Sequence, residues 1–144
     1  MINTRLMTID DIEQVLDVEN NSFALPWSEN AFRKEMKEND LALYVVIEEN
    51  GRVVGYAGLW VIGHEGHITN VAVHPQFRKK GYGDLLIDRL LCEGEKKGIN
   101  AYTLEVRVSN RPAQKLYEKY GFKSVGIRPK YYEDNKEDAM IMWK

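Results

Sequence analysis

The stretch NVAVHPQFRKKGYGDLLIDRLL carries three basic residues and two glycines between two apolar runs. If the first run is a strand and the second a helix, Gly81 and Gly83 lie at the helix N-terminus, where backbone N–H groups and the helix dipole favour an anion. Arg78, Lys79 and Lys80 add positive charge at the same place. The stretch therefore predicts a phosphate site, and a pyrophosphate fits that description.

Two familiar phosphate motifs do not match this loop. A Walker loop ends in Gly-Lys-Ser or Gly-Lys-Thr, and neither triplet occurs in the chain. A dinucleotide fingerprint needs a third glycine where Leu86 stands and a chain that begins with a strand, whereas the N-terminus is predicted to be helical. The expected ligand is therefore neither a magnesium-bound triphosphate nor NAD. If only the loop is considered, the same residues could form a tight turn beside a basic patch that faces solvent, with no ligand.

The residues before this loop predict two helices followed by strands. Thr8 is a candidate N-cap for a first helix, and Ser28 caps a second one after an ordered loop around Pro26 and Trp27. Two apolar strands flank the dipeptide Asn50-Gly51, which suits a type I′ hairpin turn. A further strand covers residues 67–73 and ends before a proline. The apolar residues that repeat at helical spacing in the first helix are Ile9, Ile12, Val15 and Leu16.

The residues after the loop continue the alternation of helices and strands. A helix whose apolar stripe is Leu85, Leu86, Leu90 and Leu91 is expected to stop near Gly98. The segment AYTLEVRVSN is a strand that places Glu105 on its less apolar face. Ser109 or Asn110 caps a short helix that Gly121 terminates, and strands follow at 123–128 and 139–143. This order predicts one mixed α/β sheet with helices on its faces.

Length, charge and cysteine content limit the classes of function. With 144 residues the chain is expected to form a single domain over residues 1–144. A net charge of −2 argues against general nucleic-acid binding, because that requires an excess of basic residues on one face. The single cysteine, Cys92, is read as packing within an apolar helix, and the histidines have no ligand spacing, so no metal site is expected. No leader or membrane span is apparent, which predicts a cytoplasmic protein.

The glycine loop has the form Q/R-x-x-G-x-G/A and resembles the acetyl-CoA loop of the GNAT superfamily of N-acetyltransferases. The preceding strand, ITNVAV, and the later segment LEVRVSNRPAQKLYEKYGF are similar to the rest of that superfamily's cofactor site. Together with FALPWSENAF and YYEDNKEDAMIMWK, they resemble the RimI type, the ribosomal-protein alanine N-acetyltransferases, over essentially the full chain. The resemblance implies a single, mostly antiparallel central sheet flanked by about four helices, of the α+β kind.

The resemblance also implies roles for individual residues. Glu105 would be the general base, and Tyr117 the general acid that protonates the departing CoA thiolate. Asn110 and Tyr117 would also contact the cofactor's pantetheine arm. Direct attack in a ternary complex is implied, without a covalent acetyl-enzyme. The other cofactor-binding residues would be Val71, Ala72 and Val73 through the strand backbone, and Arg78, Lys79, Lys80, Gly81, Tyr82, Gly83 and Asp84 through their amides.

The acceptor implied by the resemblance is the N-terminal alanine of a ribosomal protein, the eighteenth of the small subunit. An acidic and aromatic loop would suit a basic peptide, and its candidate residues are Pro26, Trp27, Tyr131, Tyr132, Glu133 and Asp134. The same loop could be only a charged hairpin turn. Two other functions stay open: acetylation of a small amine, and a non-catalytic acyl-CoA-binding module. Additional protein partners are also left open.

Simpler structural roles exist for the three main candidates. Glu105 could pair with Arg107 or with a cation on a neighbouring strand. Tyr117 shares a helical face with apolar residues and could belong to the core, while its hydroxyl is still functional. Asn110 could be only a helix cap, which is compatible with a cofactor contact.

Overall fold

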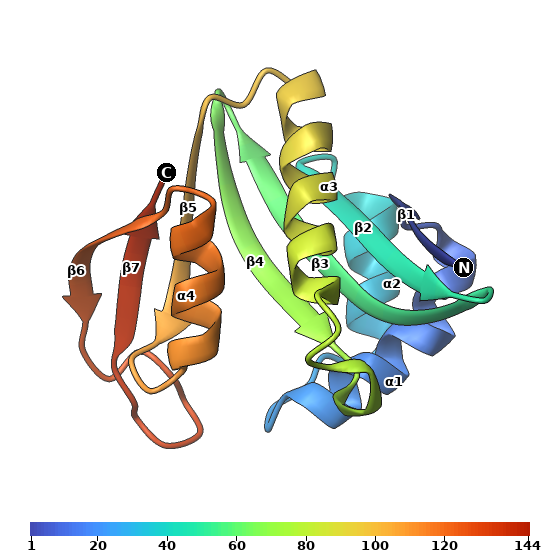
Figure 1. Cartoon of the computed structure of the whole chain (residues 1–144), viewed down its shortest axis with the longest axis horizontal. Helices are drawn as coiled ribbons and strands as arrows, with labels where there is room; N and C mark the ends of the chain where they lie inside the picture. The colour runs from blue at the N-terminus through green and yellow to red at the C-terminus, as the bar shows by residue number, and fades with distance from the viewer.

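The computed structural model describes residues 1–144 and contains one seven-stranded sheet. Its strand order is β1-β2-β3-β4-β5-β7-β6 (Figure 1). The strands are β1 (Ile2–Leu6), β2 (Ala42–Glu49), β3 (Arg52–Ile62), β4 (Glu65–Val73), β5 (Ala101–Arg107), β6 (Lys123–Arg128) and β7 (Ala139–Trp143). The helices are α1 (Ile12–Ser22), α2 (Glu29–Glu38), α3 (Tyr82–Lys96) and α4 (Arg111–Lys119), with short 3-10 turns at Ile9–Asp11 and Pro75–Phe77.

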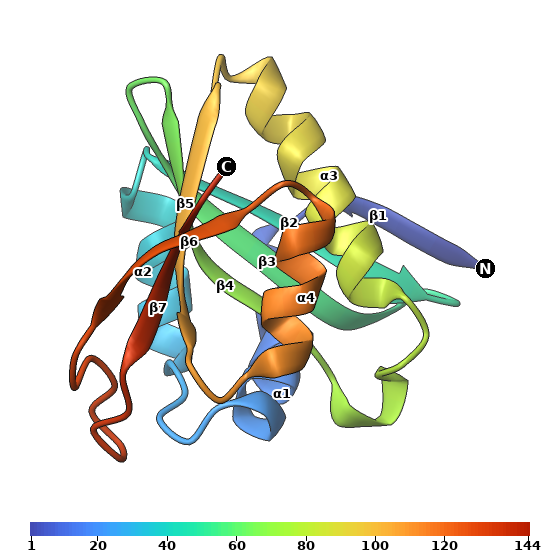
Figure 2. The same ribbon diagram turned by 60° about the vertical axis from the view of Figure 1, so that its left-hand side comes forward.

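Neighbouring strands are antiparallel except for β4 and β5, which are parallel. Helices α3 and α4 lie on one face of the sheet, and α1 and α2 lie on the other (Figures 1 and 2). Each face has its own apolar core, the larger beneath α3 and the smaller beneath α1 and α2. The predicted mixed, mostly antiparallel sheet with four helices is confirmed.

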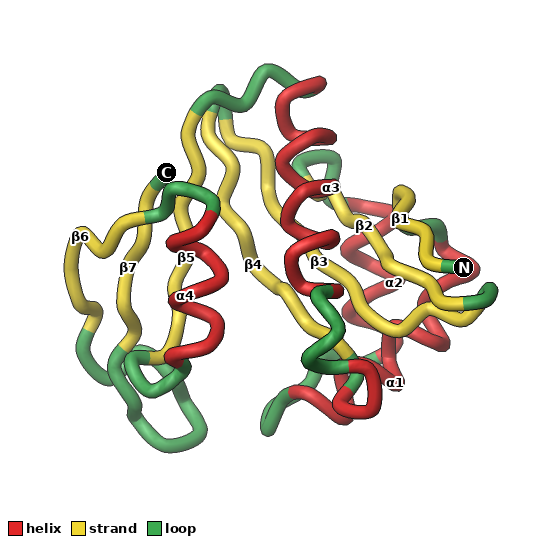
Figure 3. The backbone as a smooth tube through the Cα atoms, viewed as in Figure 1, coloured by secondary structure: helices red, strands yellow, loops and turns green.

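Strands β4 and β5 pair over only part of their length. Their register runs from Glu65 opposite Ala101 to Ile68 opposite Leu104, and beyond this the two strands diverge (Figures 1 and 3). At the point of divergence Thr69 is an extra residue in β4, because Gly58 of β3 faces Asn70 while Leu59 faces Ile68. Such a bulge bends a strand and breaks its pairing locally. The sheet is therefore split where β4 and β5 separate.

Several local predictions are confirmed. The Ser28 hydroxyl accepts from the Ala31 N–H at 3.2 Å, and Asn110 Oδ1 accepts from the Ala113 N–H at 3.2 Å, so both residues are N-caps. Asn50 and Gly51 have φ angles of 52° and 85°, as the type I′ turn requires. These signals are reliable because each depends on residues at most three positions apart.

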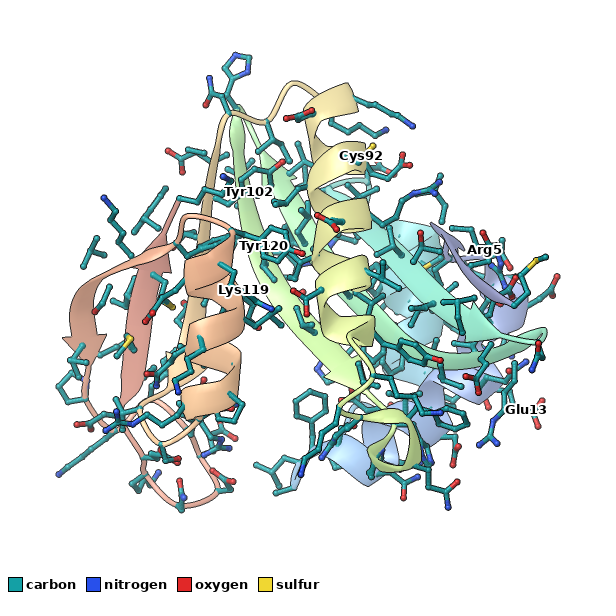
Figure 4. All side chains as sticks on the ribbon, viewed as in Figure 1. Arg5, Glu13, Cys92, Tyr102, Lys119 and Tyr120 are labelled. Atoms are coloured by element: carbon teal, nitrogen blue, oxygen red, sulfur yellow. The ribbon has the colours of Figure 1, made fainter.

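Other predictions from the sequence were wrong. The N-terminus is not helical from its start, because Ile2–Leu6 forms β1, an edge strand paired with β2. The chain therefore begins with a strand, and only the missing third glycine still argues against a dinucleotide fingerprint. Cys92 is exposed on the outer side of α3 (Figure 4), and Leu85 is 41% exposed, so neither belongs to the core.

No helix is long and apolar enough to span a bilayer.

Candidate functional site

A cavity of about 560 Å³ lies where β4 and β5 separate. Its lining includes side chains from both faces of β5: Glu105 and Arg107 from one face, and Leu104 and Val106 from the other. Tyr117 of α4 completes the second side. Because the lining comes from both faces, the cavity passes through the split in the sheet. Two ligands approaching from opposite faces could meet in it.

Glu105 lies at this cavity and is largely shielded from solvent, with a side chain only 12% exposed. His67 Nε2 of β4 lies 2.7 Å from Glu105 Oε2 and donates to it. This hydrogen bond lowers the pKa of the Glu105 carboxyl, although burial alone would raise it. His67 takes the place of the neighbouring-strand cation in the simpler role considered for Glu105, and it is a cation only when its imidazole is protonated. The other oxygen, Oε1, bonds to no protein group.

Tyr117 lies across the cavity from Glu105, on the side of the sheet that α3 and α4 cover. Its ring packs edge-on against Phe122 with centroids 5.8 Å apart, so the ring does belong to the core. No protein group bonds to its hydroxyl, which opens onto the cavity. Burial raises the pKa of the Tyr117 phenol well above its ordinary value. The hydroxyl is therefore protonated at neutral pH and can donate a proton.

One wall of the cavity is the loop between α1 and α2. Glu19 of α1 is 2% exposed, and its Oε2 accepts from the Trp27 N–H at 2.9 Å. Its other oxygen accepts from the Tyr56 hydroxyl. Trp27 lines the cavity, whereas the neighbouring Pro26 does not. A buried carboxylate thus fixes the position of this wall.

The opposite wall is the loop between β6 and β7, which contributes Tyr131 to Asp134. Arg107 Nη2 lies 2.9 Å from Asp134 Oδ2, Nη1 lies 3.3 Å from Glu137 Oε1, and the guanidinium sits 3.9 Å from the Tyr132 ring centroid. Arg107 therefore neutralises part of the negative charge of this loop, which was expected from the sequence to bind a basic peptide. Glu133 takes part in none of the ion pairs, so its carboxylate is available to a basic group of the acceptor.

The floor of the cavity holds an unpartnered polar group. Asn70 of β4 lines the cavity, and its Oδ1 is buried without any hydrogen-bond partner. Buried polar atoms are nearly always paired in folded proteins, so this unpaired acceptor sets Asn70 apart from the other buried polar groups. Asn70 had no predicted role, and nothing in the strand ITNVAV marks it locally.

The structure offers backbone groups suited to an extended arm and a pyrophosphate. Beyond Ile68 the edge of β4 that faces β5 has no ladder partner, so Val71 to Val73 can pair with an extended ligand. In the loop, the N–H groups of Lys79, Lys80 and Gly81 donate to no protein acceptor. The next three amides belong to the first turn of α3, and the N–H groups in the first turn of a helix have no acceptor within that helix. These features fit a CoA-like molecule.

The side chains of this loop are mostly engaged by the protein. Arg78 Nε donates to the Val73 carbonyl at 2.9 Å and ties the loop to β4. Lys80 Nζ lies 3.8 Å from Glu49 Oε1. Gly81 is required by its φ of 80°, whereas a Cβ on Gly83 would lie 3.1 Å from Leu116 of α4. The two glycines thus serve different purposes: one allows the turn, and the other allows α3 to approach α4.

Helices α3 and α4 are linked directly in front of the split strands. Lys119 Nζ lies 2.7 Å from Asp84 Oδ1, and the Tyr120 hydroxyl donates to the Asp84 carbonyl at 3.1 Å. Figure 4 shows both side chains in the space between α4 and α3. The link fixes the helix that carries Tyr117 relative to the helix that begins at the phosphate loop.

The structure brings most of the predicted site residues together, in two groups. Glu105, Asn110, Tyr117, Val71 and Trp27 line one cavity with Tyr131 to Asp134, while residues 78–84 form the loop before α3. Ala72 and Val73 contribute through the β4 backbone and do not line the cavity. Pattern reading did not identify His67, Glu19, Asn70 or Arg107, whose significance comes from contacts with distant parts of the chain.

Known proteins resemble this chain in sequence. The model of the acetyltransferase (GNAT) family matches residues 12–122. A Bacillus subtilis (strain 168) protein provisionally named ribosomal protein bS18-alanine N-acetyltransferase is 43% identical over 139 residues, which cover 96% of this chain and 92% of that protein. The ribosomal protein bS18-alanine N-acetyltransferase of Escherichia coli (strain K12) is 37% identical over 134 residues, with 92% and 89% covered.

The fold is also similar to solved structures. The crystal structure of the ribosomal-protein-S18-alanine N-acetyltransferase from Escherichia coli matches with a TM-score of 0.89 and 34% identity, covering 99% of this chain and 92% of that one. Ard1 from Thermoplasma volcanium matches with a TM-score of 0.88 and 28% identity, covering 99% and 96%. The family resemblance seen in the sequence is confirmed, and this chain belongs to the GNAT acetyltransferase family.

Proposed function

We propose that this protein transfers the acetyl group of acetyl-CoA to the α-amine of an N-terminal alanine, and that its acceptor is ribosomal protein bS18. Two relatives named for this reaction, 43% and 37% identical to this chain, support the proposal. The observation that carries it is the cavity through the split sheet, with Glu105 on one side and Tyr117 on the other. Residues 1–144 act as one acetyltransferase domain, and a ribosomal acceptor places the reaction in the cytoplasm.

Acetyl-CoA supplies the thioester whose carbonyl carbon the amine attacks. The unpaired backbone of Val71, Ala72 and Val73 holds the pantetheine arm, and Asn110 contacts its lower part. The amides of Lys79, Lys80, Gly81, Tyr82, Gly83 and Asp84 hold the pyrophosphate at the start of α3, whereas the Arg78 amide, also expected there, already donates to the Pro75 carbonyl. This arrangement leaves the opposite face of the split for the acceptor.

Glu105 and Tyr117 divide the proton transfers between them. An α-ammonium with a pKa near ~8 loses one proton toward Glu105 before it can attack. As the C–N bond forms and the C–S bond breaks, the nitrogen releases its second proton to water, from which Tyr117 recovers the proton that it donates. Tyr117 gives a proton to the departing thiolate, whose ordinary pKa is about 8.5, so this donation is helpful rather than essential. No covalent acetyl-enzyme is required.

The acceptor peptide enters between the two walls formed by Trp27 and by residues 131–134. Tyr131 and Tyr132 provide apolar surface there, together with Pro26, which precedes Trp27 in the chain. Glu133 favours a basic residue shortly after the N-terminal alanine, because its carboxylate takes part in no ion pair. Asp134 supports the wall through Arg107 and contributes less charge.

CoA release tests this function directly. Purified protein is supplied with acetyl-CoA and a six-residue peptide beginning Ala-Arg, with the same peptide blocked at its N-terminus, and with spermidine. Turnover with the free peptide alone is the expected result. Turnover with spermidine alone would assign the protein to the small-amine acetyltransferases. No CoA release with any of the three compounds, together with retained CoA binding, would favour a non-catalytic acyl-CoA-binding module.

The acceptor preference is tested with a second peptide that begins Ala-Glu. The wild-type protein should prefer Ala-Arg, and Glu133→Gln should reduce that preference by about two- to fivefold, the range of a partly exposed charge pair. Glu118→Gln, on the exposed side of α4, is the matched control and should not alter it. An unchanged preference in Glu133→Gln would remove this residue from acceptor recognition.

A further inference from the structure

The contact between His67 and Glu105 lies at the apex of the split in the sheet. His67 is one residue before Ile68, the last residue of β4 that pairs with β5. It faces Thr103 in the parallel register, and Glu105 follows Thr103 by two residues on the same face of β5. The diagonal between them is spanned by the 2.7 Å bond from Nε2 to Oε2. The second-to-last paired position of the two strands therefore fixes the orientation of the carboxylate.

His67 is placed behind Glu105 as seen from the cavity. Glu105 lines the cavity, and His67 does not. The imidazole is 33% exposed, whereas the Glu105 side chain is 12% exposed. His67 therefore lies on the solvent side of a carboxylate that is itself shielded. A proton that reaches the carboxylate from the cavity can leave through the imidazole.

Few charged groups act on this pair. Arg128 of β6 is the other cation close enough to influence both residues, and Tyr131 and Tyr132 lie near the carboxylate as neutral phenols. Trp60, opposite His67 in β3, is uncharged and donates to Glu35 instead. The charge state of Glu105 is thus governed chiefly by His67.

We propose that His67 is a positioning residue for the acetyl transfer proposed above. Through its 2.7 Å bond it orients the Glu105 carboxylate toward the acceptor amine, and by its own charge it sets the pH above which that carboxylate accepts a proton. When the imidazole is neutral, the α-ammonium gives one proton to the pair, which shares it across the bond and later releases it to water. When the imidazole is already protonated, the pair has no place for that proton. The inference rests on the proposed function.

The direction of the pKa shifts agrees with this geometry. The hydrogen bond to Glu105 raises the pKa of His67 above its ordinary value near 6.5, even though burial opposes the change. A glutamate whose pKa is lowered is by itself a weak base, whereas general bases are most effective when their pKa lies near the working pH. Coupling to His67 brings the proton affinity of the pair closer to that of the amine.

The first test observes the pair without any substrate. The chain has three histidines, and their ring proton signals can be assigned with His64→Gln and His67→Gln. In the full-length protein, His67 should titrate above about 6.5, and its pKa should fall in Glu105→Gln. An unchanged His67 titration in Glu105→Gln would overturn the inference, whether or not the protein acetylates any peptide.

The second test compares kcat/KM of the wild type and His67→Gln from pH 6 to pH 9 with the Ala-Arg peptide. Ionisation of the amine affects both proteins equally and cancels in their ratio. The ratio of wild type to variant should rise with pH and reach about tenfold, a modest part of what a general base contributes. A ratio that stays constant would mean that His67 has only a structural role, and would overturn the inference.

His64→Gln is the matched control for both tests. His64 lies in the turn between β3 and β4, three residues before His67, and its Nδ1 lies 3.1 Å from the Gly98 carbonyl. The same substitution there should preserve the wild-type pH profile and the His67 titration. If the wild type is inactive on peptides, the proposed function fails, while the titration still decides whether His67 controls Glu105.

Discussion

Replacing Glu19 by glutamine should loosen the cavity wall that contains Trp27. Glu19 is 2% exposed, and its two carboxylate oxygens accept from the Trp27 N–H and from the Tyr56 hydroxyl. Glutamine retains one acceptor oxygen and turns an NH₂ group toward the other donor. One buried donor is then left without a partner, and the substitution is nearly isosteric, so lost packing does not confuse the result.

The expected loss of stability follows from this bond count. Leaving one buried donor unsatisfied costs about 1 to 3 kcal/mol. A loss of about 2 kcal/mol lowers the folding equilibrium constant roughly 30-fold, and for a chain of this length it lowers Tm by about 4 to 8 °C. Because Trp27 lines the acceptor side of the cavity, the KM for the peptide should also rise, while the KM for acetyl-CoA should not.

Urea unfolding followed by tryptophan fluorescence measures the first effect, and steady-state kinetics with the Ala-Arg peptide measure the second. Glu13→Gln is the control, since Glu13 is an exposed residue on the same helix (Figure 4). Tyr56→Phe should lower stability while leaving the peptide KM unchanged, because the bond to Trp27 remains. If Glu19→Gln unfolds at the wild-type urea concentration and keeps the wild-type peptide KM, Glu19 does not hold the loop.

Three further predictions concern other parts of the molecule. Tyr117→Phe should lower kcat at least tenfold with little change in stability, because its ring still packs against Phe122; unchanged turnover would exclude the hydroxyl as proton donor. Gly81→Ala should cost about 1 to 2 kcal/mol, because the φ of 80° disfavours a side chain even in open space; calorimetry should also show weaker CoA binding, and wild-type binding would contradict this. Burial opposes ionisation of Asp11, but hydrogen bonds, chiefly from Arg5, lower its pKa below the ordinary value; this stabilisation is complete above the unfolded pKa near ~3.9 and is lost as the pH falls through the folded pKa. Asp11→Asn should therefore reduce stability in thermal melts at pH 7 and matter less in acid, and an equal loss at pH 7 and pH 3 would argue against this linkage.

The sequence by itself determined the features that depend on neighbouring residues. The caps at Ser28 and Asn110, the hairpin turn at Asn50-Gly51 and the glycine loop before α3 all follow from interactions over a few positions. The order of helices and strands from residue 9 onward was also predictable from apolar periodicity. The family resemblance rested on the same local segments, and the comparisons confirmed it.

Only the tertiary structure decided how distant segments combine into a site. Strand β1 escaped prediction because a five-residue edge strand with mixed polarity gains its stability from pairing with β2. The pairing of His67 with Glu105 spans 38 positions, and that of Arg107 with Asp134 spans 27. Such contacts are set by strand register and by the divergence of β4 from β5, and register depends on partners that no local pattern specifies. The sequence shows which residue types the chain carries, whereas the fold sets their charges and their access to the cavity.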